Sequence, residues 1–547
     1  MRSDAPVQVL PGSPVPDSIT PRDAVTSPHL DRDLPGWLTS GLAVPAALLA
    51  ILVYAALMSL DGAAARFFWS DEIVTIAVSR LSSPSAIWAA LKAATDGNPP
   101  GFYIIESALA SVTSDPHVSF RVASVLGLLL TSIALFIFVR RSAGAIGGLL
   151  AATMPLLTPL FSFFAIEARP YSVLVACLAW AMVTWQNVGR PWRPVGFALL
   201  LMAAVSIHFY ALVAIVPFGV AELAWSLQAR KVRLRVWAAL ATAIVPLAVF
   251  WPQVASMRQG FGAHFWAREG PTFMLTAHEQ TLGLPDYWSV SVVVALSASL
   301  LFEALRALRT PDAPPETTSE KVLLLALINL PVIAYGMTVV ADSALTSRYV
   351  LPSTLGVIAA LSSAAARGPW RRGAVCLVVL LLVVAFRGGR HWRDRPESAK
   401  NLEHPDTAVL EELLRSPGRP DLPVVVSNGH AFLEMSYYRG TAASSRFTYL
   451  LDRDAAIKHA SSDSVDRELE LLSSLMQLDL APRSAFLRQH PRFLMFSKPN
   501  RWDWLYAQLV EEGFSVRPLS VTRSEDGPLC VLYLVERSEP VGANDVR

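Results

Sequence analysis

The sequence predicts a multi-span α-helical membrane protein of about 11 transmembrane helices with a small, soluble C-terminal α/β domain. Of the 547 residues, 53% are hydrophobic and only 16% are charged, and the mean hydropathy is +0.41. Apolar runs recur from residue 41 to residue 386, and the composition then becomes that of a water-soluble chain. This balance excludes a disordered chain and argues against a purely water-soluble protein. The net charge of +2 provides no basic surface for nucleic acid.

The first apolar run fixes where the membrane part begins. Residues 1–40 are rich in Pro, Ser and Asp and show no apolar periodicity, which predicts a disordered tail. The run at 41–60 is long enough to cross about 30 Å of hydrocarbon and longer than the core of a signal peptide, so it predicts a membrane anchor. Further apolar runs lie at 122–139, 144–164, 170–187, 194–206, 209–228, 234–252, 288–308, 322–341, 349–366 and 372–386. In lipid such runs must be helices, because every backbone polar group needs a partner within its segment.

The positive charges predict the orientation. With the 1–40 tail in the cytoplasm and the spans alternating, the short cytoplasmic loops contain 14 Lys and Arg residues, and the longer outside loops contain eight. This bias fits eleven spans, with the C-terminal domain outside. If 194–228 were a single span, the cluster at 230–235 would lie outside, which favours two spans there.

Three parts of the chain are expected outside the membrane. The first outside loop, 61–121, contains two short segments, 85–94 and 102–113, that predict interfacial helices. The second loop, 253–287, is rich in Phe, Trp, His and Gly. The third part is the domain at 388–547, which follows the transmembrane domain at 41–387. Its predicted strands are 423–427, 492–497, 514–521 and 529–536, and its predicted helices are near 431–438 and 502–512.

The most informative motif is a pair of carboxylates, Asp71 and Glu72, that follows three aromatic residues directly after the first span. Such a pair near a membrane is costly unless it is solvated or used. One interpretation is helix capping by Ser70 or Asp71, and the other is catalysis; the two are compatible.

Three more motifs are predicted on the same side of the membrane. Asn98-Pro99-Pro100 predicts a rigid turn. Glu167-Ala168-Arg169-Pro170-Tyr171 could form an ion pair or an anion site. Ser347-Arg348-Tyr349 stands at the start of a late span.

The order of these motifs resembles that of GT-C type polyprenyl-phosphate-sugar-dependent glycosyltransferases (glycosyltransferase family 39). Similar branches are the protein O-mannosyltransferases, the aminoarabinose transferases acting on lipid A and the rhizobial galacturonosyltransferases. The resemblance covers about 40–390 and is strongest between Phe67 and Tyr171.

The resemblance implies a role for each motif position. Asp71 corresponds to the general base, and Glu72 completes the acidic pair. Arg121, Arg169, Arg348 and Tyr349 are expected to bind the donor phosphate. Supporting residues of the pocket are Asn98, Pro99, Pro100, Glu167 and Tyr171; relatives often have His or Lys at the position of Asn98.

The same residue types suit the chemistry. Arginine binds phosphate through a fixed fork of donors, and a carboxylate deprotonates an acceptor hydroxyl. Because neighbours on a helix point in different directions, Asp71 and Glu72 cannot form a hydrolase-type pair, so direct displacement with inversion is expected. No cofactor is certain; a divalent metal is left open, with His264 as a candidate ligand.

The expected function is therefore sugar transfer from a polyprenyl-phosphate donor to a hydroxyl of a lipid, glycan or protein acceptor. Composition suggests a bacterial plasma (inner) membrane. The alternative is a polytopic transporter or lipid-carrier flippase. Transporters place ionisable residues near mid-membrane and often contain repeats, whereas here the charges gather at the outside ends of the spans.

Overall fold

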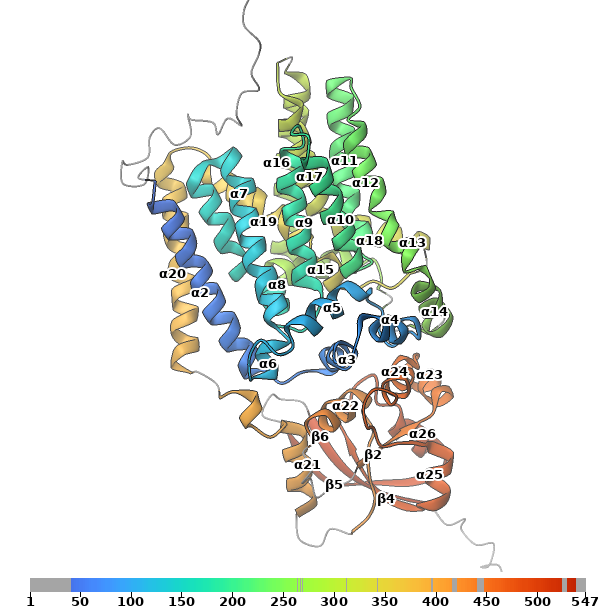
Figure 1. Cartoon of the computed structure of the whole chain (residues 1–547). Coiled ribbons are helices and arrows are strands. Elements are labelled where there is room, and N and C mark those ends of the chain that lie inside the picture. The colour runs from blue at the N-terminus through green and yellow to red at the C-terminus, as the bar shows by residue number, and fades with distance from the viewer. Residues whose placement is uncertain are drawn as a thin grey trace, which may run out of the picture.

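The computed structural model describes residues 41–537 except for short gaps. The gaps are 263, 266, 268, 311, 342, 395–396, 416–420, 440–446 and 524–528. The tail expected at 1–40 lies outside the described residues. The chain forms a helical bundle, a layer of short helices at one end of it, and a sheet-containing domain beneath that layer (Figure 1).

The bundle is built from helices whose composition is apolar along most of their length. They are α2 (Ala43–Ala65), α7 (Val122–Thr153), α8 (Pro159–Phe164), α9 (Tyr171–Gln186), α10 (Arg193–Ile207), α11 (Ala211–Ala229), α12 (Leu234–Thr242), α13 (Ile244–Val249), α15 (Phe273–Leu282), α16 (Asp286–Arg309), α17 (Pro315–Ile328), α18 (Leu330–Ala341), α19 (Ser353–Ala366) and α20 (Trp370–Arg393), with 3₁₀ turns η1 (Met154–Leu156) and η2 (Ser347–Val350).

Helix α7 contains a chain reversal. Gly144 has φ 71° and ψ −175°, which is not helical. A Cβ at Gly148 would lie 3.0 Å from the carbonyl oxygen of Phe136, although twelve residues of straight helix would separate the two positions by about 18 Å. The two arms therefore pack side by side, as the separate runs at 122–139 and 144–164 predicted.

The expected apolar runs all coincide with helices. Among the described residues, five helices are long and apolar enough to cross a membrane. Two bent pairs, α12–α13 with α14 (Trp251–Phe261) and α17 with α18, raise this number to seven if each pair is one span. Three shorter apolar helices, α9, α10 and α19, stand among them. With α7 counted as two arms, the helices account for the eleven runs predicted from the sequence.

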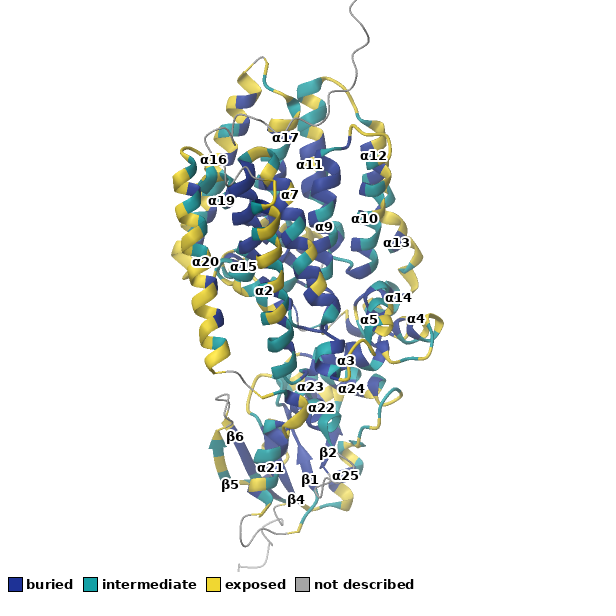
Figure 2. Ribbon diagram, turned by 60° about the vertical axis from the view of Figure 1, so that its left-hand side comes forward, coloured by how far each residue is buried: buried dark blue, intermediate teal, exposed yellow. Residues whose placement is uncertain are grey.

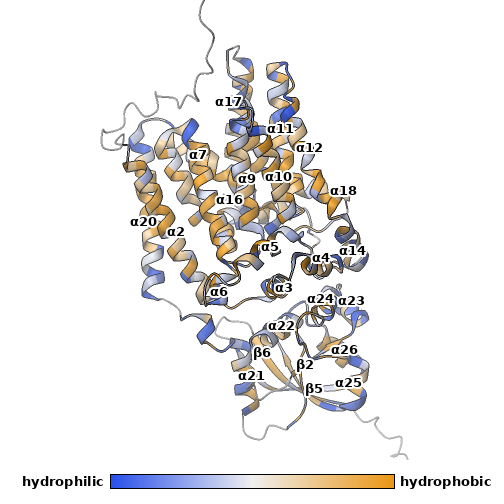
Figure 3. Cartoon of the chain, in the orientation of Figure 1, coloured by the Kyte–Doolittle hydropathy of each residue, from blue (hydrophilic) through white to orange (hydrophobic). Residues whose placement is uncertain are grey.

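The bundle has the surface expected of a membrane domain. Apolar residues dominate its middle, and polar residues gather at the end far from the sheet (Figure 3). The outward faces of α16 and α20 are largely exposed (Figure 2), and only 17% of the apolar window of α20 is buried. Exposed apolar faces of this extent are consistent with contact to lipid.

The first outside loop forms the layer between the bundle and the sheet. It contains α3 (Ser70–Ser79), α4 (Pro84–Lys92), α5 (Pro100–Leu109) and α6 (Pro116–Ser119). Helices α4 and α5 match the two short segments expected at 85–94 and 102–113. α14 lies beside α4, where Trp88 and Phe250 pack ring to ring at 5.4 Å (Figure 1).

The C-terminal domain is a six-stranded sheet with helices around it. The strand order is β3-β2-β1-β4-β6-β5; β3, β2, β1 and β4 pair in parallel, and β6 is antiparallel to both β4 and β5. The strands are β1 (Val424–Val426), β2 (Phe447–Leu451), β3 (Leu480–Pro482), β4 (Arg492–Ser497), β5 (Phe514–Arg523) and β6 (Leu529–Arg537). The helices are α21 (Pro405–Arg415), α22 (Gly429–Tyr438), α23 (Arg453–Ala460), α24 (Ser464–Leu472), α25 (Arg483–Gln489) and α26 (Leu505–Glu511), preceded by the turn η3 (Ala399–Asn401).

This domain confirms the predicted α/β class. The four predicted strands correspond to β1, β4, β5 and β6, while β2 and β3 were not predicted. The domain shares one apolar core with the helical layer, because Phe68, Ile73 and Val74 pack in the same cluster as Phe432 and Leu494. The C-terminal domain is thus packed directly under the helix that carries the acidic motif.

Candidate active site

Helix α3 presents the acidic motif at its first turn. The N-cap residue is Trp69, so neither Ser70 nor Asp71 caps the helix as one sequence interpretation expected. The backbone N–H of Trp69 donates instead to Glu72 Oε2 at 3.3 Å, and that of Ser70 donates to Glu434 Oε1 of α22 at 3.1 Å. The start of the helix is therefore capped partly by the C-terminal domain, which leaves Asp71 free to face elsewhere.

Asp71 faces two arginines from distant parts of the chain. Its Oδ2 lies 2.5 Å from Nη1 of Arg348 and 3.6 Å from Nη2 of Arg169. Burial alone would raise the pKa of Asp71, but Arg348 and Arg169 outweigh it, and the pKa lies below its usual value. The position near the N-terminus of α3 also favours the ionised form. Asp71 is thus a carboxylate between two guanidinium groups.

Arg169 is held by several acceptors. Its Nη1 donates at 2.9 Å to Asp96 Oδ2, to Thr75 Oγ1 and to the carbonyl oxygen of Asp71. Its Nε has no hydrogen-bond partner among the described residues, although only 5% of the residue is exposed. A buried donor without a partner usually marks a place where a ligand or water belongs.

These residues line one cavity of about 170 Å³. Its walls come from α3, the segment before α5, the start of α9, α14, η2 and the C-terminal helix α24. The lining includes Asp71, Val74, Asp96, Asn98, Arg169, Tyr171, His208, Tyr210, Met257, Phe261, Arg348, Tyr349, Ser464 and Glu468. Two arginines, several carboxyl groups and an aromatic wall thus meet at the end of the bundle that faces the C-terminal domain.

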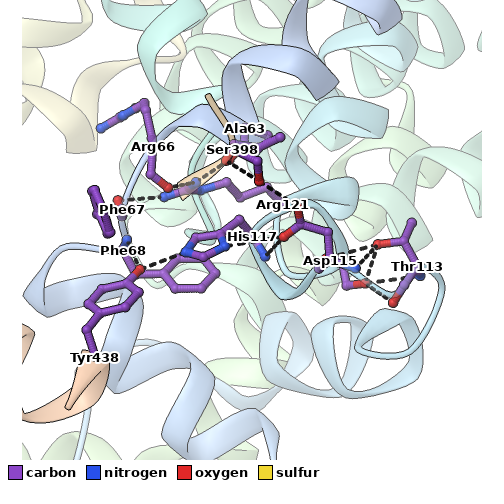
Figure 4. Close-up of polar contacts among 12 residues, drawn as sticks. Ala63, Arg66, Phe67, Phe68, Thr113, Asp115, His117, Arg121, Ser398 and Tyr438 are labelled. Carbon is purple, nitrogen blue, oxygen red and sulfur yellow. Dashed lines mark hydrogen bonds and ion pairs between the residues drawn. The ribbon is translucent and has the colours of Figure 1, made fainter. Parts of the chain in front are cut away.

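Glu72 takes a different direction from Asp71. It forms a buried ion pair with Arg121, in which Nε donates to Oε1 at 2.8 Å and Nη2 to Oε2 at 2.7 Å. The remaining donors of Arg121 reach the carbonyl oxygens of Ala63, Arg66 and Phe67 (Figure 4). Neither Glu72 nor Arg121 lines the cavity, and both side chains are fully buried.

A second network anchors the aromatic residues that precede α3. The backbone N–H of Phe68 donates to the hydroxyl of Tyr438 at 2.6 Å, and that hydroxyl lies 2.9 Å from Nε2 of His117 (Figure 4). The His117 ring stacks on Phe68 with centroids 4.6 Å apart. Since Tyr438 belongs to α22, the C-terminal domain fixes the segment on both sides of the α3 start.

Comparison with known proteins points to one class. Residues 96–255 match the family model described as dolichyl-phosphate-mannose-protein mannosyltransferase. The fold is similar to that of ArnT from Cupriavidus metallidurans in the apo state, with a TM-score of 0.51 and 14% identity, covering 88% of this chain and 97% of that chain. Residues 96–255 therefore resemble a glycosyltransferase family, and the chain has a fold similar to that of ArnT.

Two further structures are similar at lower scores. ArnT bound to undecaprenyl phosphate gives a TM-score of 0.47 at 14% identity, covering 91% of this chain and 98% of that chain. The Archaeoglobus fulgidus oligosaccharyltransferase tethered with an acceptor peptide gives 0.44 at 11% identity, covering 93% and 76%. A comparison with curated proteins finds no match.

The other motif residues divide into two groups. Asn98, Tyr171 and Tyr349 line the cavity with Asp71. Pro99, Pro100 and Glu167 do not: the prolines begin α5, and Glu167 is buried and accepts from Nη2 of Arg66 at 3.2 Å.

Two carboxyl groups of the cavity lining were not expected from the sequence. Asp96 pairs with Arg169, and it could have been noticed as the acid two residues before the Asn-Pro-Pro turn. Glu468 comes from α24 of the C-terminal domain, and no local signal marks it in the sequence. Burial raises its pKa to about 8, and Asp71 and Asp96 act in the same direction.

Metal-ligating side chains gather at another place. His264 is exposed and is not part of the cavity lining. His404, Asp406 and Glu434 bring their ligand atoms within 4.8 Å of one another. However, the Lys498 ammonium donates to both carboxylate oxygens of Asp406, at 2.9 and 2.8 Å. A cation there would meet this ammonium group, so the cluster is a poor fit for a divalent metal.

Proposed function

We propose that this chain is a glycosyltransferase that moves a sugar from a polyprenyl-phosphate donor to an acceptor hydroxyl, with Asp71 as the general base. The observation that carries the proposal is the contact of Asp71 with both Arg348 and Arg169 in one cavity. A carboxylate in contact with two guanidinium groups provides a base and an anion site side by side.

The proposed reaction has one chemical step. The acceptor oxygen forms a bond to the anomeric carbon, and the bond from that carbon to the phosphate oxygen breaks. The acceptor proton passes to the Asp71 carboxylate, and the departing lipid phosphate is held by Arg169 and Arg348. Because the arginines stabilise the charge that develops on the phosphate, no acid is needed to protonate the leaving group.

The ion pairs of Asp71 suggest how the base becomes stronger when the donor binds. Arg348 and Arg169 lower the pKa of Asp71, which makes it a weak base while it is paired. A phosphate that binds the same guanidinium groups would compete with Asp71 for them and add negative charge nearby. Both effects would raise the pKa of Asp71, so donor binding would prepare the base for its proton.

Inversion at the anomeric carbon follows from the same arrangement. Retention would need a carboxylate free to form a covalent sugar intermediate. Glu72 is unsuited to that role because Arg121 occupies it, and Asp96 is paired with Arg169. Burial raises the pKa of the Glu468 carboxyl to about 8, so at neutral pH this third group is protonated and is a poor nucleophile. Direct displacement by the acceptor is the mechanism that these pairings favour.

The sidedness of the reaction rests on the charges of the loops. The short loop at 230–235 between α11 and α12, which contains four of the predicted cytoplasmic Arg and Lys residues, lies at the bundle end far from the cavity (Figure 1). By the positive-inside rule, the cavity and the C-terminal domain lie outside the cytoplasm. We place the enzyme in a bacterial inner membrane, acting on a lipid, glycan or protein of the cell envelope.

The test compares Asp71→Asn with a matched surface variant, Asp454→Asn, on the exposed part of α23. Mass spectrometry of envelope glycans and lipids from cells with and without the wild-type chain identifies the product. Cells with Asp71→Asn should lack this product although the protein is expressed, and cells with Asp454→Asn should make it normally. Full product formation by Asp71→Asn would remove Asp71 as the base.

A further inference from the structure

The C-terminal domain sends a carboxyl group into the cavity of the membrane domain. Glu468 and Ser464, one helical turn apart on α24, line the cavity together with Asp71, Arg169 and Arg348. Within the described part of the chain, the Glu468 carboxyl makes no hydrogen bond or ion pair. The other two cavity carboxylates, Asp71 and Asp96, are both paired with arginine.

An unpaired carboxyl beside two arginines needs a physical reason. Charge neutrality supplies one, because the ion pairs of Asp71 and Asp96 already balance Arg169 and Arg348. An ionised Glu468 would therefore add an uncompensated negative charge to a partly buried site. The groups that act on its charge are Asp71, Asp96, Arg169 and Arg348, and burial has the largest effect; together they raise its pKa to about 8. At neutral pH the group is an acid that can donate a hydrogen bond.

Arg169, which lines the cavity, also has one hydrogen-bond donor without a partner among the described residues. Nε of Arg169 has no hydrogen-bond partner in the described chain, and the residue is buried. An anion between Arg169 and Glu468 would accept from both. A phosphate oxygen fits this pair of donors, since charge-assisted bonds to phosphate are short and strong.

We infer that Glu468 binds the lipid-linked phosphate directly, as a hydrogen-bond donor from the C-terminal domain opposite Arg169 and Arg348. The inference rests on the proposed function, because it takes a polyprenyl phosphate as the ligand. It gives the C-terminal domain a part in donor binding: the domain completes the phosphate site that the membrane domain begins.

The test is binding of undecaprenyl phosphate to the full chain in nanodiscs between pH 7 and pH 9.5. If only the protonated form of Glu468 accepts the ligand, the wild-type Kd rises about thirtyfold over this range, because a group with a pKa of about 8 loses its proton there. Glu468→Gln should bind like the wild type at pH 7 and show little change up to pH 9.5. Glu468→Ala should bind about fivefold to tenfold more weakly at pH 7, from the loss of one hydrogen bond.

The controls distinguish the role of Glu468 from the proposed phosphate site on which it depends. Glu470→Gln changes an exposed residue of the same helix and should leave the pH profile of the wild type intact. Undecaprenol, which lacks the phosphate, should show no Glu468-dependent profile. The inference is overturned if Glu468→Gln keeps the steep profile, if Glu468→Ala binds like the wild type at pH 7, or if undecaprenol gives the same profile. Arg348→Ala tests the proposed phosphate site itself: unchanged binding by that variant would refute the site, whatever Glu468 does.

Discussion

Replacement of Arg121 by lysine separates a structural role for this arginine from a role in donor binding. The family resemblance implies that Arg121 binds the donor phosphate, whereas the structure buries it against Glu72. Lysine keeps the positive charge but not the fork of donors. The variant Arg121→Lys therefore tests geometry rather than charge.

The expected loss follows from the contacts of the guanidinium group. Arg121 makes two hydrogen bonds to Glu72 and three to the carbonyl oxygens of Ala63, Arg66 and Phe67. Removing one partner of a buried ion pair costs about 3–5 kcal/mol, and lysine recovers part of that. We expect a loss of about 3 kcal/mol. In a chain of this length, 1 kcal/mol displaces the thermal midpoint by roughly 1–2 °C, so the midpoint should fall by about 3–6 °C.

The assay measures thermal unfolding in detergent and transfer kinetics on the same preparations. Arg121→Lys should also lower kcat, because Glu72 is the neighbour of Asp71 and holds the first turn of α3, while the KM for the donor should change little. A matched control is Arg230→Lys in the loop after α11, whose midpoint and kinetics should be those of the wild type. A normal midpoint combined with a raised donor KM would refute the structural role and restore the phosphate role.

Three further variants test other parts of the account. Glu434→Ala removes the acceptor of the Ser70 N–H and should lower kcat about fivefold, because the start of α3 loosens. Glu434→Gln keeps an acceptor oxygen and should have a kcat close to that of the wild type. Equal losses of kcat in both variants would contradict the capping role of Glu434. Asp96→Asn removes the charge opposite Arg169 and should lower kcat/KM about tenfold with little change in the thermal midpoint. An unchanged kcat/KM would show that Asp96 does not position Arg169. Gly127→Ala puts a Cβ 2.7 Å from the backbone of Ser172, where α7 and α9 pack closely; its midpoint should fall, and a wild-type midpoint would contradict this packing.

The membrane part of the fold could be predicted from the sequence because lipid restricts the backbone to few structures. Long apolar runs must be helices, and the break before residue 144 was visible as a short polar interruption with two arginines. The structure adds Gly144, whose positive φ makes the reversal. The strand β3 was missed because its three residues, Leu-Ala-Pro, include no β-branched side chain, whereas the equally short β1 is three valines. The strand β2 was missed because its sequence, Phe-Thr-Tyr-Leu-Leu, does not alternate regularly between polar and apolar residues.

The site residues could be predicted from the sequence only where they lie in a motif. Asp71, Arg169 and Arg348 lie in recognisable motifs, and the structure brings them together. The opposite directions of Asp71 and Glu72 were also expected, because adjacent residues on a helix point apart. The role of Glu468 was not accessible, since the docking of one domain under another has no local pattern. The same holds for the capping of α3 by Glu434.

The most direct test of the shared cavity is the affinity of Asp71→Asn for undecaprenyl phosphate. If Asp71 competes with phosphate for Arg348 and Arg169, removing its charge should leave binding as tight as in the wild type or several-fold tighter, although transfer is lost. Arg348→Ala, measured alongside, should lose most of the binding. If Asp71→Asn instead binds the lipid phosphate as weakly as Arg348→Ala does, the base and the anion site do not share the arginines, and the central claim is contradicted.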